Sequence, residues 1–95
     1  MYVILEGQVE VISESNGHSA RVAVLDKGDF FGEMAIFQKA ARTATIRTLT
    51  NTRLLTIDKK TFLSRIDEDP SLAFRIVETL SRRISNMTQA LLANN

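Results

Sequence analysis

The hydrophobic pattern divides the chain near residue 58. Before that point, short apolar or alternating runs are separated by turn signals, as in β-strands. We expect strands over Tyr2–Glu6, Gln8–Ser13, Arg21–Leu25, Thr43–Thr50 and Arg53–Asp58. Gly7, Asn16-Gly17 and Asp26–Asp29 are expected to form the turns between them. Short strands at this spacing predict an all-β sandwich or barrel.

Residues 59–95 carry a helical pattern instead. Asp58 is placed to cap a short helix that runs to about Ile66, and Asp69-Pro70 is typical of the start of a second helix. That second helix spans about 22 residues, or about 33 Å. One apolar stripe follows it, formed by Ala73, Val77, Leu80, Ile84, Met87 and Leu91. The stripe fits either a seam between two copies or packing on the chain's own core, and both alternatives stay open.

Composition excludes several classes of protein. The 95 residues suit one domain, and the net charge of +1 argues against a nucleic-acid binder, which needs a dense basic face. With no cysteine and one histidine, His18, expected in a hairpin loop, we expect no disulfide, iron–sulfur cluster or metal site. Because no membrane span or targeting segment is recognisable, we expect a soluble, cytoplasmic module.

The candidate chemistry lies in Phe30–Phe37 and in Arg42-Thr-Ala-Thr45. Gly32 permits a close backbone approach, and residues 33–37 can form one helical turn whose N–H groups attract an anion. Arg42 can fork two N–H groups onto a phosphate, whereas Glu33 would repel a phosphate but can accept from a sugar hydroxyl. This combination describes a ribose-phosphate ligand. An ordinary exposed Glu33–Arg42 ion pair is the alternative, so the residues alone indicate only a possible small phosphate site.

Phe31-Gly-Glu-Met-Ala35 followed by Arg42-Thr-Ala-Thr45 resembles the phosphate-binding cassette of cyclic nucleotide-binding domains. Such domains occur in bacterial catabolite activators, cyclic-nucleotide-dependent kinases and ion channels. The resemblance also covers Met1–Val11, Leu25–Glu33 and Arg53–Ile57. It implies a mainly β fold with C-terminal helices, a jelly-roll-like β-roll that lacks its first strands. Residues 1–58 would form the partial roll with the cassette at 31–45, and residues 59–95 the hinge and long helix, within one domain of residues 1–95.

The resemblance also implies the roles of the site residues. Glu33 would accept from the ribose 2′-hydroxyl, with Gly32, Met34 and Ala35 beside the sugar-phosphate. Arg42 would pair with the phosphate, and Thr43 and Ala44 would complete its cradle through backbone N–H groups. The Thr43 hydroxyl corresponds to a position that reaches the guanine 2-amino group in cyclic-GMP-dependent kinases, so cyclic AMP and cyclic GMP both remain open as ligands.

In the long helix, aligning Arg82-Arg83 with the double arginine of bacterial members places Met87 and Thr88 where the helix contacts the purine. The alternative for Thr88 is an ordinary solvated position on the helix. The resemblance predicts a regulatory sensor with no catalytic residue, no metal and no cofactor besides its nucleotide ligand.

The match breaks at the N-terminus, where the family's first strands are not seen, so either this is a fragment or the protomer is incomplete. An open sheet edge invites pairing, and we expect a homodimer through the C-terminal helix or by strand exchange. No helix-turn-helix follows, so we expect no binding of DNA by this module, and none of a membrane. One rival interpretation is a degenerate scaffold that binds no nucleotide. The other is a metal-dependent cupin, whose metal site would need more histidines than the one in this sequence.

Overall fold

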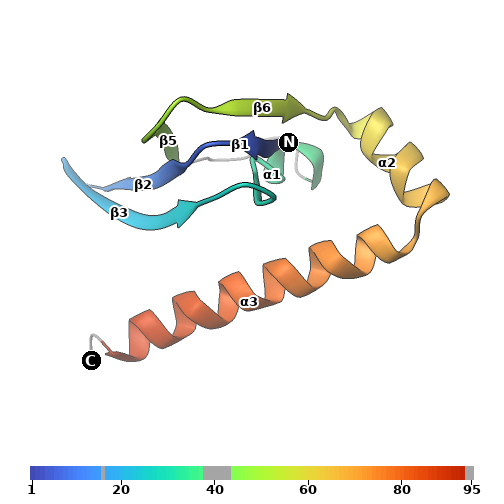
Figure 1. The fold of residues 1–95 in the computed structure, drawn as a ribbon. Coiled ribbons are helices and arrows are strands. Elements are labelled where there is room, and N and C mark those ends of the chain that lie inside the picture. The colour runs from blue at the N-terminus through green and yellow to red at the C-terminus, as the bar shows by residue number, and fades with distance from the viewer. Residues whose placement is uncertain (16, 38–43, 94–95) are drawn as a thin grey trace. The chain divides into compact units, whose positions relative to one another are not determined.

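The computed structural model describes residues 1–15, 17–37 and 44–93. The strands are β1 (Tyr2–Glu6), β2 (Val9–Ser15), β3 (His18–Leu25), β4 (Phe30–Phe31), β5 (Thr45–Thr48) and β6 (Arg53–Thr56). The helices are α1 (Met34–Phe37), α2 (Lys59–Glu68) and α3 (Ser71–Ala93). The predicted mainly β fold with C-terminal helices is confirmed (Figure 1). Residues 1–59 and 60–95 form two compact units.

The strands of the first unit form two antiparallel three-stranded sheets. One has the order β4-β1-β6 and the other the order β3-β2-β5. Two of the places where the chain crosses between the sheets are Gly7, after β1, and residues 49–52, after β5. These two crossings touch, because the Gln8 N–H donates to Thr50 Oγ1 at 3.0 Å and the Leu49 N–H to the Gln8 carbonyl at 2.9 Å.

One apolar cluster joins the two sheets. Ile4 of β1 packs there with Val9 of β2 and Leu25 of β3, and all three side chains are buried. Four partly buried side chains complete the cluster: Val11, Ala23, Phe31 and Ile46. Since Ile4 and Phe31 come from one sheet and the remaining members from the other, the first unit is a two-layered β-structure around a small core.

The second helix starts as the sequence predicts. Asp69 Oδ1 accepts from the backbone N–H of Ser71 at 3.2 Å, two residues further on, with Pro70 between them. This is the N-cap geometry, and proline costs nothing there because its missing N–H would have no helical partner. The helix has 23 residues, against the 22 or so expected.

The burial of α3 differs from the predicted stripe. Ile76, at 7% exposure, is buried, whereas Val77, Ile84 and Leu91 of the stripe are 60–69% exposed. Ile76 lies about one residue, or roughly 100°, round the helix from Val77. The apolar face of α3 is therefore wider than one stripe, and its buried part is centred beside the predicted one.

Some strand bounds also differ from expectation. Strand β3 begins at His18, which pairs with Ser15, so His18 is not in the hairpin loop where we expected it. Strand β5 is shorter than the predicted run, and Phe30–Phe31 forms a strand that the turn signal at 26–29 concealed. His18, Ser19 and Ala20 carry no large apolar side chain, and pairing with β2 nevertheless holds them in the sheet.

Candidate functional site

The glycine–glutamate segment forms a tight turn at the end of β4. Gly32 has a φ of +72°, a conformation that side chains rarely adopt, and α1 follows at Met34. The Gly32 carbonyl accepts from the Ala35 N–H at 3.3 Å, and the Glu33 carbonyl accepts from the Ile36 N–H at 2.9 Å. The predicted helical turn is thus present. It gathers Gly32, Glu33, Met34 and Ala35 within a single turn of chain.

Tyr2 lies against this turn, and the sequence analysis missed it. Its ring stacks on Phe31 with centroids 5.2 Å apart, and the two residues are direct partners in the β1–β4 ladder. A Cβ added at Gly32 would lie 3.3 Å from Tyr2 Cδ2. The glycine therefore lets the backbone of the turn approach an aromatic ring of the chain itself. The sequence offered one signal for this contact: Tyr2 is an aromatic residue two positions before the core residue Ile4 in the same strand.

Both ends of the segment between Gly32 and Thr45 are held by the same core. Phe31, just before Gly32, packs on the cluster of Ile4, Val9 and Leu25, and so does Ile46. Ala44 is exposed and immediately precedes β5. Arg42 and Thr43, the residues predicted for the phosphate, lie outside the described residues.

The helix residue predicted to meet the base lies in the second unit. Thr88 is exposed in α3, and its hydroxyl donates to the Ile84 carbonyl at 3.0 Å, one turn earlier. A threonine bonded in this way still presents its methyl group and the lone pairs of its oxygen. The role of Thr88 stays a prediction.

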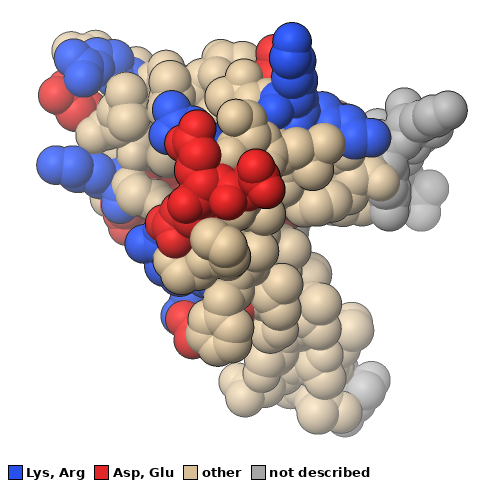
Figure 2. Space-filling view, turned by 90° about the vertical axis from the view of Figure 1, so that its right-hand side faces the viewer, with Lys and Arg blue, Asp and Glu red and all other residues tan. Residues whose placement is uncertain are grey.

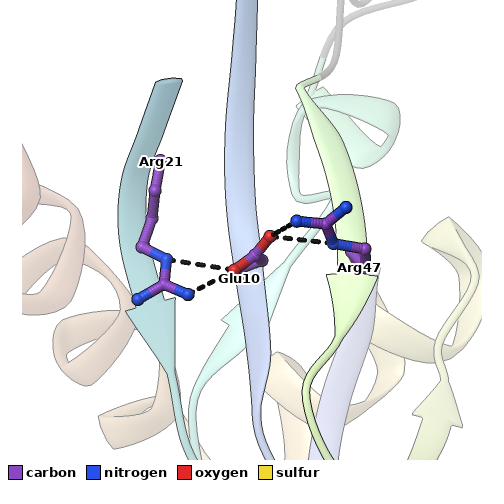
Figure 3. Close-up of polar contacts among 3 residues, drawn as sticks. All are labelled: Glu10, Arg21 and Arg47. Carbon is purple, nitrogen blue, oxygen red and sulfur yellow. Dashed lines mark hydrogen bonds and ion pairs between the residues drawn. The ribbon is translucent and has the colours of Figure 1, made fainter. Parts of the chain in front are cut away.

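A buried carboxylate lies on the outer side of the second sheet. Val9 and Val11 of β2 face the core, so Glu10 between them points away from it, yet Glu10 is only 2% exposed. Figure 3 shows Glu10 between Arg21 of β3 and Arg47 of β5. Arg21 donates to Glu10 Oε2 from Nε at 3.0 Å and from Nη2 at 2.5 Å. Arg47 donates to Oε1 from Nε at 2.9 Å and also from Nη2.

These contacts change the acidity of the buried carboxyl group. The hydrogen bonds from Arg21 and then Arg47 hold the pKa of Glu10 below its ordinary value of 4.5 and outweigh the opposing effect of burial. In the sequence, Glu10 is one polar position of an alternating strand, and nothing near it in the chain indicates a buried ion pair. Only the pairing of three strands brings the two arginines to it.

Figure 2 shows Asp and Glu side chains gathered near the centre of one face, with separate groups of Lys and Arg side chains around them. Within residues 1–15, 17–37 and 44–93, no group of three or more His, Asp or Glu side chains is placed to hold a metal ion. Over the same described residues, no helix is long and apolar enough to cross a bilayer.

Two packed sheets, a glycine–glutamate turn next to the core residue Phe31, and C-terminal helices are the architecture of a β-roll domain. The chain belongs to the cyclic nucleotide-binding domain family, whose model matches residues 1–69. The predicted family membership and jelly-roll fold are therefore confirmed. The family is defined by the binding of a nucleotide and not by catalysis, which agrees with the prediction of a regulatory module.

Relatives come from several kinds of protein. The chain is 35% identical over 83 residues to a putative potassium channel protein of Rhodopseudomonas palustris, covering 87% of this chain and 20% of that protein. It is 41% identical over 61 residues to the cAMP-dependent protein kinase regulatory subunit of Schizosaccharomyces pombe, covering 64% of this chain and 14% of that one. The chain thus spans a fifth or less of the length of these two relatives.

A solved structure agrees with the fold over nearly the whole chain. The catabolite activator protein of Thermus thermophilus superposes with a TM-score of 0.80 at 26% identity, over 97% of this chain and 45% of that one.

Proposed function

We propose that this chain is a regulatory sensor that binds a cyclic nucleotide through residues 31–45. The observation that carries the proposal is the anchoring of both ends of that segment in one core cluster, through Phe31 and Ile46. Glu33 would accept from the ribose 2′-hydroxyl beside the Gly32 turn. Arg42 would hold the phosphate, with Thr43 and Ala44 completing the cradle through backbone N–H groups.

Cyclic AMP is the first ligand to test, since the fission-yeast relative is named for it. Cyclic GMP is tested beside it because of the hydroxyl of Thr43. Binding would be relayed through α3, with Thr88 near the base, if the nucleotide has different affinities for two positions of the helix. A module of this kind would act in the cytoplasm and would catalyse no reaction itself.

We also propose that α3 forms a contact between two copies of the chain. Six of its apolar side chains are at least 60% exposed: Phe74, Val77, Ile84, Met87, Leu91 and Leu92. No charged residue follows Arg83 in the sequence, and the lower end of the view in Figure 2, towards the C-terminal end of α3, is without charged side chains. Exposed apolar surface of this extent favours association with a partner.

The direct test of the nucleotide proposal is thermal unfolding with cyclic AMP, cyclic GMP and, as a control without the cyclic phosphodiester, 5′-AMP. At a hundredfold excess over the dissociation constant, binding stabilises the folded state by about 2.7 kcal/mol. For a chain of this size that raises the midpoint by roughly 10–20 °C. We expect the shift with a cyclic nucleotide, no comparable shift with 5′-AMP, and loss of the shift in Arg42→Ala.

An arginine elsewhere in the first unit supplies the matched control. Arg53 is exposed on β6, so Arg53→Ala removes the same charge and should keep the full shift. A wild-type chain that responds to neither cyclic nucleotide would contradict the sensor proposal. It would favour the alternative of a degenerate module that serves as an interaction scaffold.

A further inference from the structure

The Glu10–Arg47 ion pair joins strand β2 to strand β5 and bears on the register between them. Among the strands that the structure describes, β5 pairs only with β2, over the register Val9↔Thr48 to Ile12↔Thr45. Glu10 and Arg47 are direct partners in that register. A register slip of one residue would turn every side chain of β5 to the opposite face. The fork of Arg47 on a buried carboxylate therefore specifies which residues of β5 face the core and which face outward.

The start of β5 is the place where the predicted phosphate cradle meets the sheet. Ala44, predicted to offer a backbone N–H to the phosphate, immediately precedes Thr45, the first residue of β5. Arg47 lies three residues after Ala44, and its side-chain exposure of 69% contrasts with the 3% of Glu10. The exposed partner of the pair is thus on β5, the strand that leads from the cradle, and the buried partner is on β2, the central strand of the sheet.

Arg21 holds the same carboxylate from the opposite side and depends on an irregularity of β3. The register runs Val11↔Ala23 and then Ile12↔Arg21, so Val22 is an extra residue in a β-bulge. Ile12 is two residues from Glu10 and shares its face, and the bulge brings Arg21 to that face as well. Without the bulge, Val22 would face Ile12 and Arg21 would point to the core side.

We propose that Glu10 is a positioning residue for nucleotide binding, which through Arg47 fixes strand β5 and with it the backbone of Ala44. Arg21 orients the carboxylate and occupies its other oxygen, but it acts on β3, away from the cradle. The proposal rests on the proposed function. The positioning proposal goes beyond the proposed function because its residues lie outside the segment 31–45, on the face of the sheet that points away from the core.

The two arginines provide a matched pair of variants. Arg47→Met and Arg21→Met each remove one fork from the same carboxylate and keep the apolar stem. We expect Arg47→Met to weaken binding of cyclic AMP about tenfold, measured by titration calorimetry, because a charge-assisted contact that orders the cradle is lost. Arg21→Met should stay within about twofold, although both variants lower the thermal midpoint. Arg47→Lys, which keeps the charge but not the fork, should fall between Arg47→Met and the wild type.

A merely structural role would give a different result. If the two methionine variants weaken binding equally, or if neither does, the positioning proposal is overturned. Glu10→Gln is the further check, since it keeps the shape of the side chain and should weaken binding as Arg47→Met does. Its failure to do so would also contradict the proposal.

Hydrogen exchange separates this proposal from the proposed function. In the nucleotide-free chain, amides of residues 44–48 should exchange at least about tenfold faster in Arg47→Met than in Arg21→Met, because local opening of β5 becomes easier. A wild-type chain that binds no cyclic nucleotide would defeat the proposed function, and exchange would still test whether Glu10 fixes β5. Equal protection of these amides in both variants would overturn that fixing role.

Discussion

At the scale of single residues, Glu10 combines burial with two ion pairs, which makes stability depend on its ionisation. Its pKa is lowered in the folded chain, so the folded state favours the charged carboxylate more than the unfolded state does. The resulting stabilisation is present above the ordinary value of 4.5 and is lost as the pH falls through the lower folded pKa.

We expect Glu10→Gln to flatten the loss of stability at low pH. The wild-type free energy of unfolding should decline between about pH 5 and pH 3, and Glu10→Gln should show a smaller slope across that window because this linked proton is gone. Urea unfolding at several pH values measures both slopes. Glu14→Gln, an exposed position on the same strand, should keep the wild-type slope. Equal slopes for wild type and Glu10→Gln would show that other carboxyl groups dominate acid unfolding.

At the scale of elements, two of the connections between the sheets, β1 to β2 and β5 to β6, are packed against one another at Gly7. Its φ is +94°, and a Cβ there would lie 2.4 Å from the Asn51 carbonyl oxygen, which is backbone and cannot turn aside. Gly28 has a similar φ of +91° but open space around it. Comparing alanine variants of Gly7 and Gly28 therefore separates two free-energy costs, that of the left-handed backbone and that of the clash with Asn51.

We expect Gly28→Ala to lower the free energy of unfolding by about 1–2 kcal/mol, the cost of a left-handed conformation for a residue with a Cβ. Gly7→Ala should lower it by roughly 2–5 kcal/mol, since the overlap with backbone adds an overpacking cost. Urea unfolding of both variants gives the difference. Similar values would mean that the crossing at 49–52 shifts readily to admit the methyl group.

Local signals explain what could be predicted of these elements. The turn at Asp26–Asp29, the positive φ of Gly7 and the cap at Asp69 each depend on residues near in sequence, and all three are present. Glu10 could not be predicted, because its partners lie 11 and 37 residues away and one of them depends on a bulge. Tyr2 was missed for a similar reason: its contact with Gly32 requires the pairing of β1 with β4.

At the scale of the whole molecule, α3 carries a large exposed apolar surface. Ile76 is buried, whereas Ile84 is 60% exposed and Leu91 69% exposed. The sequence left two alternatives for this helix, a seam between copies and packing on the chain's own core. The exposed side chains extend the apolar face beyond the buried one, which favours a partner for the C-terminal half of the helix.

We expect the chain to self-associate and Ile84→Glu to weaken that association at least about tenfold, because a carboxylate within an apolar contact loses its hydration. Sedimentation equilibrium between about 1 and 200 µM covers the range of a weak dimer. Asn86→Glu, roughly 160° away round the helix, adds the same charge outside the apolar face and should associate as the wild type does. If the wild type is monomeric throughout and Ile84→Glu instead lowers its thermal midpoint, the face packs within one chain and the seam is wrong. If the wild type is monomeric and Ile84→Glu changes nothing, the face has no partner of either kind.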